Sequence, residues 1–477
     1  MKRFLKALFN LPYVLYLVYR TSLPYLLDIR WWERALVEER GDVNTTTFLA
    51  DAKQIYGAIQ DQINSKAIIL NLFKDGSKMG TPVNSIGIRG WTFLARLARN
   101  WNMGFRAEYS GAGSQPGQQG VGAAGAQGLA QSTVVLKYEY SPQVVTGQAE
   151  NLTKGASRAF MQAKALEAKY DMEDILSHTN VVMAGAERGG AIAQTTASAA
   201  GQFTADNTGN LPGALYLRVG MPIDIGPIGG GVNSVTGATI TAINYATRVV
   251  TISAGTPTNG QAVYLSGEAA LTTGAFPLTC EGLQSLVSNT GAIQGLDPSV
   301  ASQTSWQSFV SAPGAVDISA QLIDELISFV ENRGGQPVDM LLISPAQKNK
   351  YVAIATANLR YDVTGPGAAV GKKALDLGFQ TYNFGGVPMI VDKDLRPDRI
   401  FALNSDALRK FEALPLSMAD DEAGAWTRIT GANGVADAVS GLLRWYFQLG
   451  TTQRSAMGVM LGLNVPADFL TLPSTLG

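Results

Sequence analysis

Cysteine and histidine are almost absent from this chain of 477 residues, which has one of each, Cys280 and His178. A single cysteine excludes an internal disulfide and a cysteine-built metal cage. A single histidine excludes zinc sites built from several histidines and most two-histidine iron sites, and it leaves little room for triad chemistry. We therefore expect no enzyme, and we assign no catalytic, cofactor-binding or metal-binding residue and no cofactor.

Charged residues are also scarce, at 16% of the chain, against roughly 25% in typical soluble domains. Abundant small residues and few charges suit a surface that is mostly covered by copies of the same chain, although secreted adhesins share this composition. The formal net charge of -1 excludes a protein that holds nucleic acid by neutralising its phosphates. A container for DNA remains compatible with this charge, because containment requires no affinity.

No apolar run is long enough to span a bilayer, which takes about 20 residues. The best candidate, Leu11 to Tyr19, follows three basic residues as in a signal peptide, but Pro12 interrupts it, Arg20 ends it, and no small-residue cleavage site follows. We interpret residues 1–45 as an N-terminal arm that packs on a neighbouring subunit or serves during assembly. Export or membrane attachment stays open as the alternative.

Residues 46–147 are expected to contain a lead-in segment and a projecting arm. Residues 46–103 contain helical spacing from Thr47 to about Phe73 and then a lead-in broken by glycine and proline. Residues 104–147 contain a tract of Gly, Ala, Gln and Ser that cannot bury enough apolar surface to fold alone. Because Thr133 to Tyr140 alternates like a strand, we predict an extended hairpin loop that finds a partner in another subunit.

A long helix and a β-rich segment follow. Within residues 148–205 we predict a helix from Leu152 to about His178, which places His178 at the helix end, where it favourably meets the helix dipole, and then a loop-like stretch to Gly209. Residues 206–275 predict a small inserted barrel of five short strands. These strands are Leu215–Val219, Met221–Ile225, Ala238–Asn244, Arg248–Ser253 and Ala262–Ser266.

Residues 276–405 alternate between helix and strand, which predicts an α/β domain. Asp317 is the expected N-cap of a helix whose face carries Ile318, Leu322, Leu326 and Phe329 and which stops at Gly334-Gly335. A strand from Met340 to Ile343 and a helix begun by Ser344-Pro345 come next, and then strands at Gly386–Val391 and Arg399–Leu403. Residues 406–477 contain long strands such as Leu442–Leu449, expected to complete the domain that holds the long helix.

Four features imitate functional sites, and each has a simpler interpretation. Residues 365–373 lack the first glycine and the Ser/Thr of a phosphate loop, so we predict a mobile loop with basic residues. The acidic run 420–422 is interpreted as a solvated loop, Asp392 and Asp394 as turn-forming residues, and Cys280 as a small buried residue. The tryptophans are expected to anchor cores or interfaces: Trp31, Trp32, Trp91, Trp101, Trp306, Trp426 and Trp445.

Three stretches, together with the order of the predicted elements, carry a resemblance to a known family. They are residues 138–148 running into the long helix, residues 330–345, and the strand at 385–392 followed by the strand at 399–408, which ends in Asn-Ser-Asp-Ala-Leu. From about residue 45 to its end the chain resembles the Hong Kong 97-type coat proteins of tailed bacteriophages.

The resemblance implies an α+β fold of the Hong Kong 97 type, with an N-arm, an extended hairpin loop, a long spine helix, and peripheral and axial domains, and it accommodates an inserted small β-barrel. It implies a major capsid protein that self-assembles into pentamers and hexamers, forming an icosahedral head around double-stranded DNA. Expected partners are copies of the chain, scaffolding, portal and decoration proteins, and non-specifically contacted DNA, with no membrane.

The expected location is the virion, and the host cytoplasm during assembly. Some relatives cross-link through a lysine of the hairpin loop, but Lys137 lies in strand-like sequence and we do not predict a cross-link there. The alternative function is a secreted or surface-anchored β-rich adhesin, indicated by the N-terminal run and the Gly/Thr-rich strands.

Overall fold

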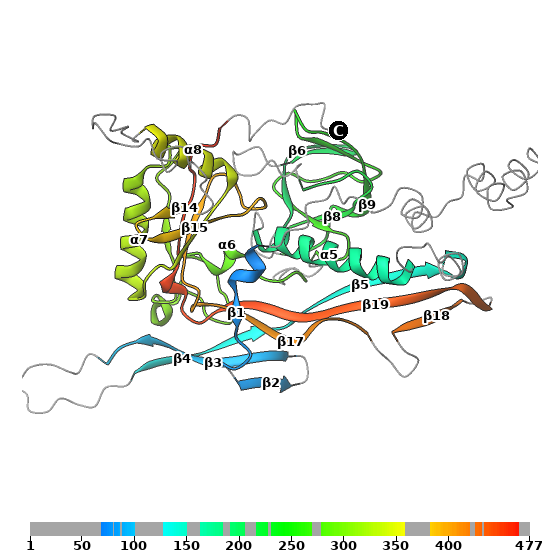
Figure 1. The fold of residues 1–477 in the computed structure, drawn as a ribbon, viewed down its shortest axis with the longest axis horizontal. Helices are drawn as coiled ribbons and strands as arrows, with labels where there is room; N and C mark the ends of the chain where they lie inside the picture. Colours follow the sequence, from blue (N-terminus) through cyan, green and yellow to red (C-terminus); the bar gives the residue numbers. More distant parts are fainter. Residues whose placement is uncertain are drawn as a thin grey trace, which may run out of the picture. The chain divides into compact units, whose positions relative to one another are not determined.

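The computed structural model of the chain combines helices and sheets, as predicted (Figure 1). The arm at 1–45, the helical spacing up to residue 67, the loop 365–373 and the acidic run 420–422 lie outside the described residues. The described residues are 68–79, 81–85, 88–100, 127–149, 163–184, 191–205, 216–227, 230–269, 278–357, 382–419, 425–431 and 434–466.

Two compact units divide the chain: residues 1–63, 142–171 and 420–441 form one, and residues 64–141, 172–419 and 442–477 form the other. In the described part of the first unit, β18 (Trp426–Gly431) pairs antiparallel with the first half of β19 (Gly434–Thr451). Val145 and Ala149 are buried there beside Trp426.

A six-stranded sheet organises the α/β part of the second unit. Its strands run in the order β12 (Phe309–Ser311), β20 (Gly458–Met460), β16 (Ile400–Leu403), β13 (Met340–Ile343), β15 (Val387–Val391) and β14 (Tyr382–Phe384). The strands predicted at Met340–Ile343, Gly386–Val391 and Arg399–Leu403 are therefore confirmed, and β13 and β16 are buried along their whole length. β20 comes from residues 406–477, which were expected to belong to the domain of the long helix. A strand from near the end of the chain therefore lies between β12 and β16 in the α/β sheet.

Helix α7 (Ala320–Gly334) starts later than predicted. Its N-cap is Ser319, whose hydroxyl accepts a hydrogen bond from the Leu322 N–H at 3.2 Å, whereas Asp317 binds Lys350. The buried face consists of Ile323, Leu326 and Val330, and Phe329, which was expected on the buried face, is 52% exposed. The stop is as predicted, because Gly335 has the left-handed φ of 65° that glycine tolerates.

Helix α8 (Pro345–Ala357) begins as predicted, with the Ser344 hydroxyl accepting from the Gln347 N–H at 3.3 Å. Close packing of β20 on α7 depends on Gly458, because a Cβ there would collide with the Val330 side chain. No helix in the described part of the chain is both long and apolar enough to cross a membrane.

A second sheet is built from long strands. β1 (Lys74–Asp75) pairs with β17 (Leu408–Met418), β17 pairs with β19, and β5 (Lys137–Thr146) also pairs with β19. Along β19, Leu443, Trp445, Phe447 and Leu449 alternate into the largest apolar cluster. The tryptophans Trp91, Trp306 and Trp445 are buried, which confirms their prediction as core anchors.

A three-stranded sheet forms the base of the hairpin: β2 (Thr81–Ser85), β3 (Ile88–Ala98) and β4 (Gly128–Val135). The first hairpin strand thus precedes residue 104, in the region predicted as lead-in. The single strand predicted from Thr133 to Tyr140 is instead the end of β4 and the start of β5, divided at Leu136. Glycine and proline at 80–90 hid the strand pair, because both residues weaken a strand pattern.

The long helix α5 (Ala163–Ala184) is present over its described part and continues past His178 to Ala184. His178 is therefore not at the helix end, and its Nε2 pairs with Glu268 Oε1 at 2.8 Å. The short segments η1 (Ile69–Leu72), α6 (Leu283–Leu286), η3 (Ala301–Gln303) and η4 (Arg454–Ala456) are also helical.

A closed barrel follows α5, with strand order β10-β7-β6-β11-β8-β9. Four of the predicted strands are present, but the described part of Leu215–Val219 forms a turn that ends at Gly220, whose φ is 91°. Two strands lie in the stretch predicted as loop, where β6 has the sequence AQTTASA and no large apolar residue to reveal it. The strands are β6 (Ala193–Ala199), β7 (Gln202–Ala205), β8 (Pro222–Gly226), β9 (Val235–Asn244), β10 (Val249–Ile252) and β11 (Ala262–Leu265).

One buried cation fixes the loop between α6 and the sheet. The guanidinium of Arg454 is almost completely buried and donates to four backbone carbonyls at 2.9–3.2 Å, those of Ser285, Leu286, Thr290 and Gly291. Hydrogen bonds to a charged donor are among the stronger ones in proteins, and buried carbonyls without a donor are costly.

We predict that Arg454→Leu lowers the free energy of unfolding by about 3 kcal/mol, because the four carbonyls then lose their donor. Urea denaturation followed by tryptophan fluorescence measures this loss. Arg428→Leu is the control, since Arg428 is exposed, and it should change stability by less than about 0.5 kcal/mol. Equal midpoints for the two variants would contradict the role given to Arg454.

Candidate assembly surface and its supporting junctions

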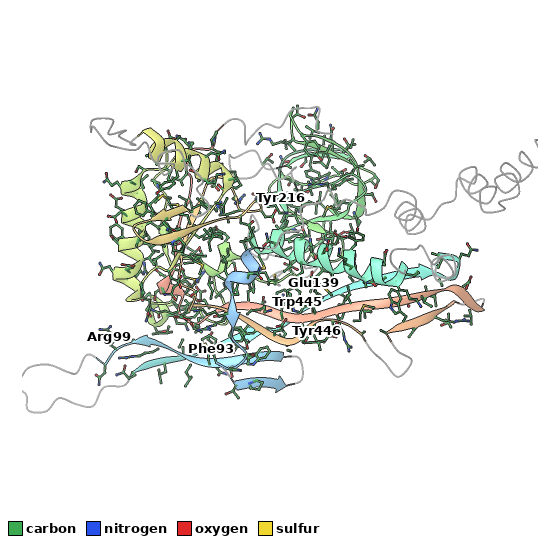
Figure 2. The ribbon with its side chains drawn as sticks, viewed as in Figure 1. Phe93, Arg99, Glu139, Tyr216, Trp445 and Tyr446 are labelled. Carbon is green, nitrogen blue, oxygen red and sulfur yellow. The ribbon has the colours of Figure 1, made fainter. Side chains whose placement is uncertain are left out.

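The hairpin sheet has two faces with different chemistry, set by the pairing of β3 with β4. Trp91 pairs with Val134 and Phe93 with Ser132, so these residues share one face. That face is packed on Phe411 of β17, with ring centroids 5.7 Å apart for Trp91 and 6.3 Å for Phe93 (Figure 2). Large apolar side chains therefore attach the hairpin to the long-strand sheet.

The opposite face presents apolar side chains to solvent. Leu94 is 70% exposed, Leu129 58% and Val135 46%. Leu94 lies opposite Gln131 of β4. Leu129 is two residues before Gln131 and Val135 is four residues after it, and side chains an even number of residues apart in a strand point to the same face, so all three share one face. Gly90 lies opposite Val135, where any Cβ would collide with the Val134 carbonyl. We call Leu94, Leu129 and Val135 the outer hairpin row.

A second exposed group consists of tyrosines on β5 and β19. Tyr446 packs edge-to-face against Tyr138 at 5.0 Å and Tyr140 at 5.8 Å between centroids, and the hydroxyls of Tyr140 and Tyr446 lie 3.3 Å apart (Figure 2). Tyr138 and Tyr140 are exposed. Aromatic side chains with a polar tip are frequent at protein interfaces, so these residues extend the candidate surface.

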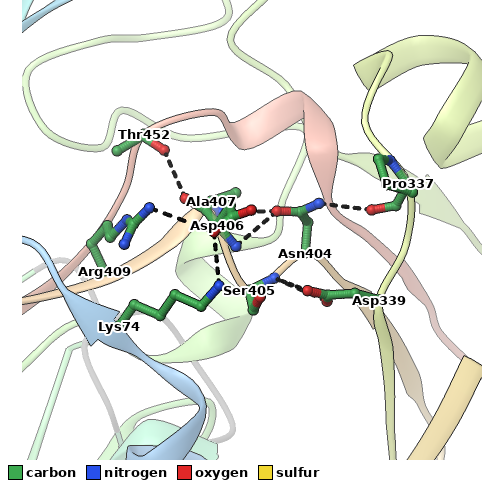
Figure 3. A network of polar contacts seen from close by, with 9 residues as sticks. All are labelled: Lys74, Pro337, Asp339, Asn404, Ser405, Asp406, Ala407, Arg409 and Thr452. Carbon is green, nitrogen blue, oxygen red and sulfur yellow. Dashed lines mark hydrogen bonds and ion pairs between the residues drawn. The ribbon is translucent and has the colours of Figure 1, made fainter.

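The Asn-Ser-Asp-Ala-Leu motif forms the turn that leads from the six-stranded sheet into β17 (Figure 3). The Asn404 Oδ1 accepts from the N–H groups of Asp406 at 2.9 Å and Ala407 at 3.1 Å, and its Nδ2 donates to the Pro337 carbonyl at 2.7 Å. The Thr452 N–H donates to the Ala407 carbonyl at 3.0 Å. The side chain of Asn404 thus closes the turn and ties it to the segment between α7 and β13.

Two carboxylates complete this junction. Asp339 accepts from the Ser405 N–H at 2.9 and 3.0 Å, and Asp406 Oδ1 lies 2.8 Å from Lys74 Nζ and 3.8 Å from the Arg409 guanidinium (Figure 3). The hydrogen bond from Lys74 and its charge lower the pKa of Asp406. Asp406 is exposed, so this pair contributes little to stability, whereas the buried Asn404 contributes more.

Asp392 and Asp394 do form a turn, with the Asp394 N–H donating to Asp392 Oδ1 at 2.7 Å, but both side chains are also buried. Asn180 of α5 donates to Asp394 Oδ2 at 2.6 Å and to Asp392 at 3.3 Å, and its Oδ1 accepts from the Ile69 N–H at 3.0 Å. Burial is the largest cause that raises the pKa of both carboxyls, that of Asp392 to about 6. This burial could not be predicted from the local sequence, because the partner Asn180 is more than 200 residues away along the chain.

The remaining predicted features show no site chemistry in the described residues. No group of His, Cys, Asp and Glu in the described ranges could hold a metal ion. Cys280 is buried, as predicted, and burial raises the pKa of its thiol well above the ordinary value, which leaves it unreactive. Lys137 is largely buried, and burial lowers its pKa.

One known protein family matches part of the chain. The family model of the SU10 major capsid protein matches residues 258–411, about a third of the chain. The matched part contains α7, β13, α8, β15, β16 and the Asn404 turn. No curated protein matches the chain.

Several solved phage structures are similar to the chain at low sequence identity. The cyanophage A-1(L) capsid asymmetric unit is 14% identical, with 85% of this chain and 95% of that one covered and a TM-score of 0.46. The Gordonia phage Cozz structure is 12% identical, covering 90% and 97%, with a TM-score of 0.40. The capsid of Myoviridae phage XM1 is 12% identical, covering 85% and 100%, with a TM-score of 0.39. These scores are low, so the family match carries the assignment.

The match over residues 258–411 indicates a structural capsid protein of a virion. It confirms the resemblance to the major capsid proteins of tailed bacteriophages that the sequence predicted. Proteins of this structural class are generally not catalytic.

We predict that Asn404→Ala destabilises the protein by about 2 kcal/mol, because two backbone N–H groups and the Pro337 carbonyl lose their partner. The midpoint of urea denaturation measures this. Ser405→Ala is a control in the same turn, since only the backbone N–H of Ser405 takes part in the network, and it should unfold like the unmodified chain. A Ser405→Ala loss as large as that of Asn404→Ala would refute the role of the amide.

Proposed function

We propose that the chain self-assembles into pentamers and hexamers that close an icosahedral head around double-stranded DNA, and that assembly takes place in the host cytoplasm. The observation that carries this proposal is the outer hairpin row, three large apolar side chains exposed on a rigidly attached sheet in a chain that carries a major capsid signature. Exposed apolar groups on a sheet favour burial against another molecule.

In the proposed Hong Kong 97-type arrangement, β3 and β4 are the base of the extended hairpin loop and α5 is the spine helix. The six-stranded sheet with α7 and α8 is the axial domain, β17 and β19 belong to the peripheral domain, and the closed barrel is the insertion. The geometry supports these assignments through element order and sheet membership. Residues 1–45 are proposed as an arm over a neighbour.

The mechanism is geometric. Each contact between subunits is modest, but every subunit repeats it, and the summed buried area stabilises the shell. The net charge of -1 supplies no strong attraction to DNA, so the proposed contacts with packaged DNA are non-specific and the shell acts as a container. Scaffolding, portal and decoration proteins are the proposed further partners. No observation in the structure favours the adhesin alternative.

Electron microscopy and light scattering of the purified chain test self-assembly. We expect shells, tubes or five- and six-fold rings. A monomer that stays dispersed at high concentration, even with a co-expressed scaffold, would contradict the proposal.

We predict that Leu94→Glu and Leu129→Glu reduce the yield of assembled particles at least tenfold, because a charge replaces an apolar contact at the interface. Sedimentation measures the yield. Stability should fall by less than about 1 kcal/mol, since both side chains are exposed. Val232→Glu is the control, because Val232 is 87% exposed on the barrel, away from the hairpin sheet in the chain. Normal assembly of both hairpin variants would remove the outer hairpin row from the interface.

A further inference from the structure

A cluster of titratable side chains lies where β5, α5 and the segment after β11 meet. Glu139 comes from β5, His178 and Thr179 from α5, and Glu268 from the turn after the last barrel strand. The Thr179 hydroxyl lies 3.0 and 3.1 Å from the two Glu139 oxygens, and His178 Nε2 lies 2.8 Å from Glu268 Oε1. Glu139 is labelled in Figure 2.

Other charged and titratable groups face this cluster. Glu139 interacts electrostatically with His178 and Glu268, and His178 also interacts with Glu268. Cys280 interacts electrostatically with Glu139, Glu268, Glu281 and Lys137. The full set is Lys137, Glu139, His178, Glu268, Cys280 and Glu281. It contains three carboxyls and two bases, so its charge depends on how many protons it holds.

The hydrogen bonds at Thr179 require one proton more than the hydroxyl can supply. Thr179 Oγ1 lies 2.8 Å from the Ile175 carbonyl, one turn earlier in α5, and also within hydrogen-bond distance of Glu139. A hydroxyl has one hydrogen to donate. If Glu139 is protonated, it donates to Thr179 Oγ1, and Thr179 donates to Ile175. If Glu139 is ionised, both oxygens compete for one hydrogen.

We propose that Glu139, Thr179, His178 and Glu268 form a proton-dependent brace, which holds β5, α5 and the exit of the barrel together when Glu139 is protonated and loosens when that proton is lost. The brace acts on the central part of the second unit. Within it, Asn180, the residue next to Thr179, holds the buried Asp392 and Asp394 on its own side of α5. Loss of the Glu139 proton would therefore affect the contacts of Thr179 and those of Asn180, which lie on the same turn of α5.

The electrostatics set the pH at which the brace changes. Burial is the largest cause that raises the pKa of Glu139 from its ordinary 4.5 to about 7, against the opposing His178 charge and the Thr179 hydrogen bond. Burial lowers the pKa of His178, but the hydrogen bond to Glu268 and the charges of Glu268 and Glu139 outweigh it, so the pKa of His178 is raised overall.

The pKa values of Glu139 and His178 are both raised in the folded state. A carboxyl with a raised pKa binds its proton more tightly in the folded state, so its stabilisation is fully present below pH 4.5 and is lost as the pH rises to about 7. The stabilisation by His178 is present below its ordinary pKa of 6.5 and is lost as the pH rises through the raised pKa. The brace is thus tightest in mildly acidic solution and weakest above neutrality.

Glu139→Gln tests the brace, because the glutamine amide donates to Thr179 at every pH. We expect the equilibrium constant for unfolding of the unmodified chain, divided by that of Glu139→Gln, to rise up to about tenfold per pH unit between about pH 5 and 7 and to level off above about pH 8. The exposed Glu325→Gln is the control and should give a constant ratio. A constant ratio for Glu139→Gln as well would overturn the proposal.

His178 provides a second measurement that does not depend on the variant folding. It is the only histidine, so an untagged, unassembled chain with isotope-labelled histidine gives one nuclear magnetic resonance signal. We expect this signal to titrate above pH 6.5 in the unmodified chain, and at lower pH in Glu139→Gln, which lacks the nearby carboxylate. Titration at or below pH 6.5 in the unmodified chain would overturn the brace.

Discussion

One buried amide determines how the parts of the second unit meet. Asn180 accepts from the Ile69 N–H and donates to Asp392 and Asp394, while the Asp394 carbonyl accepts from the Tyr216 hydroxyl at 2.9 Å. Two buried carboxyls in one turn are unfavourable unless donors surround them. The Asn180 amide supplies donors from α5 and the Tyr216 hydroxyl supplies another, so the long helix, the end of β15, the segment before β8 and the segment before β1 meet at one point.

The apolar interior is divided, and polar side chains connect its divisions. The barrel has its own apolar cluster, and one face of the six-stranded sheet packs with α7 in a second cluster, while the other face of that sheet shares the largest cluster with β19. Apolar packing is non-directional and does not by itself set how neighbouring clusters are oriented. Asn180, Asn404 and Arg454 do so, because each makes several directional hydrogen bonds to segments distant in sequence. In a subunit whose copies must repeat one geometry, such fixed junctions matter as much as core volume.

Local sequence predicted the elements well where local chemistry decides them. The Gly335 stop, the Ser344-Pro345 start and the strands β13, β15 and β16 depend on residues within a few positions. Predictions failed where a distant partner decides. The strand β6 has only small and polar residues and exists because β7 and β11 pair with it. The burial of Asp392 requires α5, and the hairpin strand β3 was concealed by neighbouring glycines.

The candidate surface could not be predicted from local sequence either, because strand pairing determines which side chains are exposed. Pairing, not composition, assigns Leu94 and Leu129 to one face of the hairpin sheet and Trp91 and Phe93 to the other. The second face is packed on Phe411, so the exposed face is held in position without contributing to the core. Nothing within the described residues covers Leu94. A sheet that is apolar on both sides but buried on one has unused apolar surface, which is available for burial against another molecule.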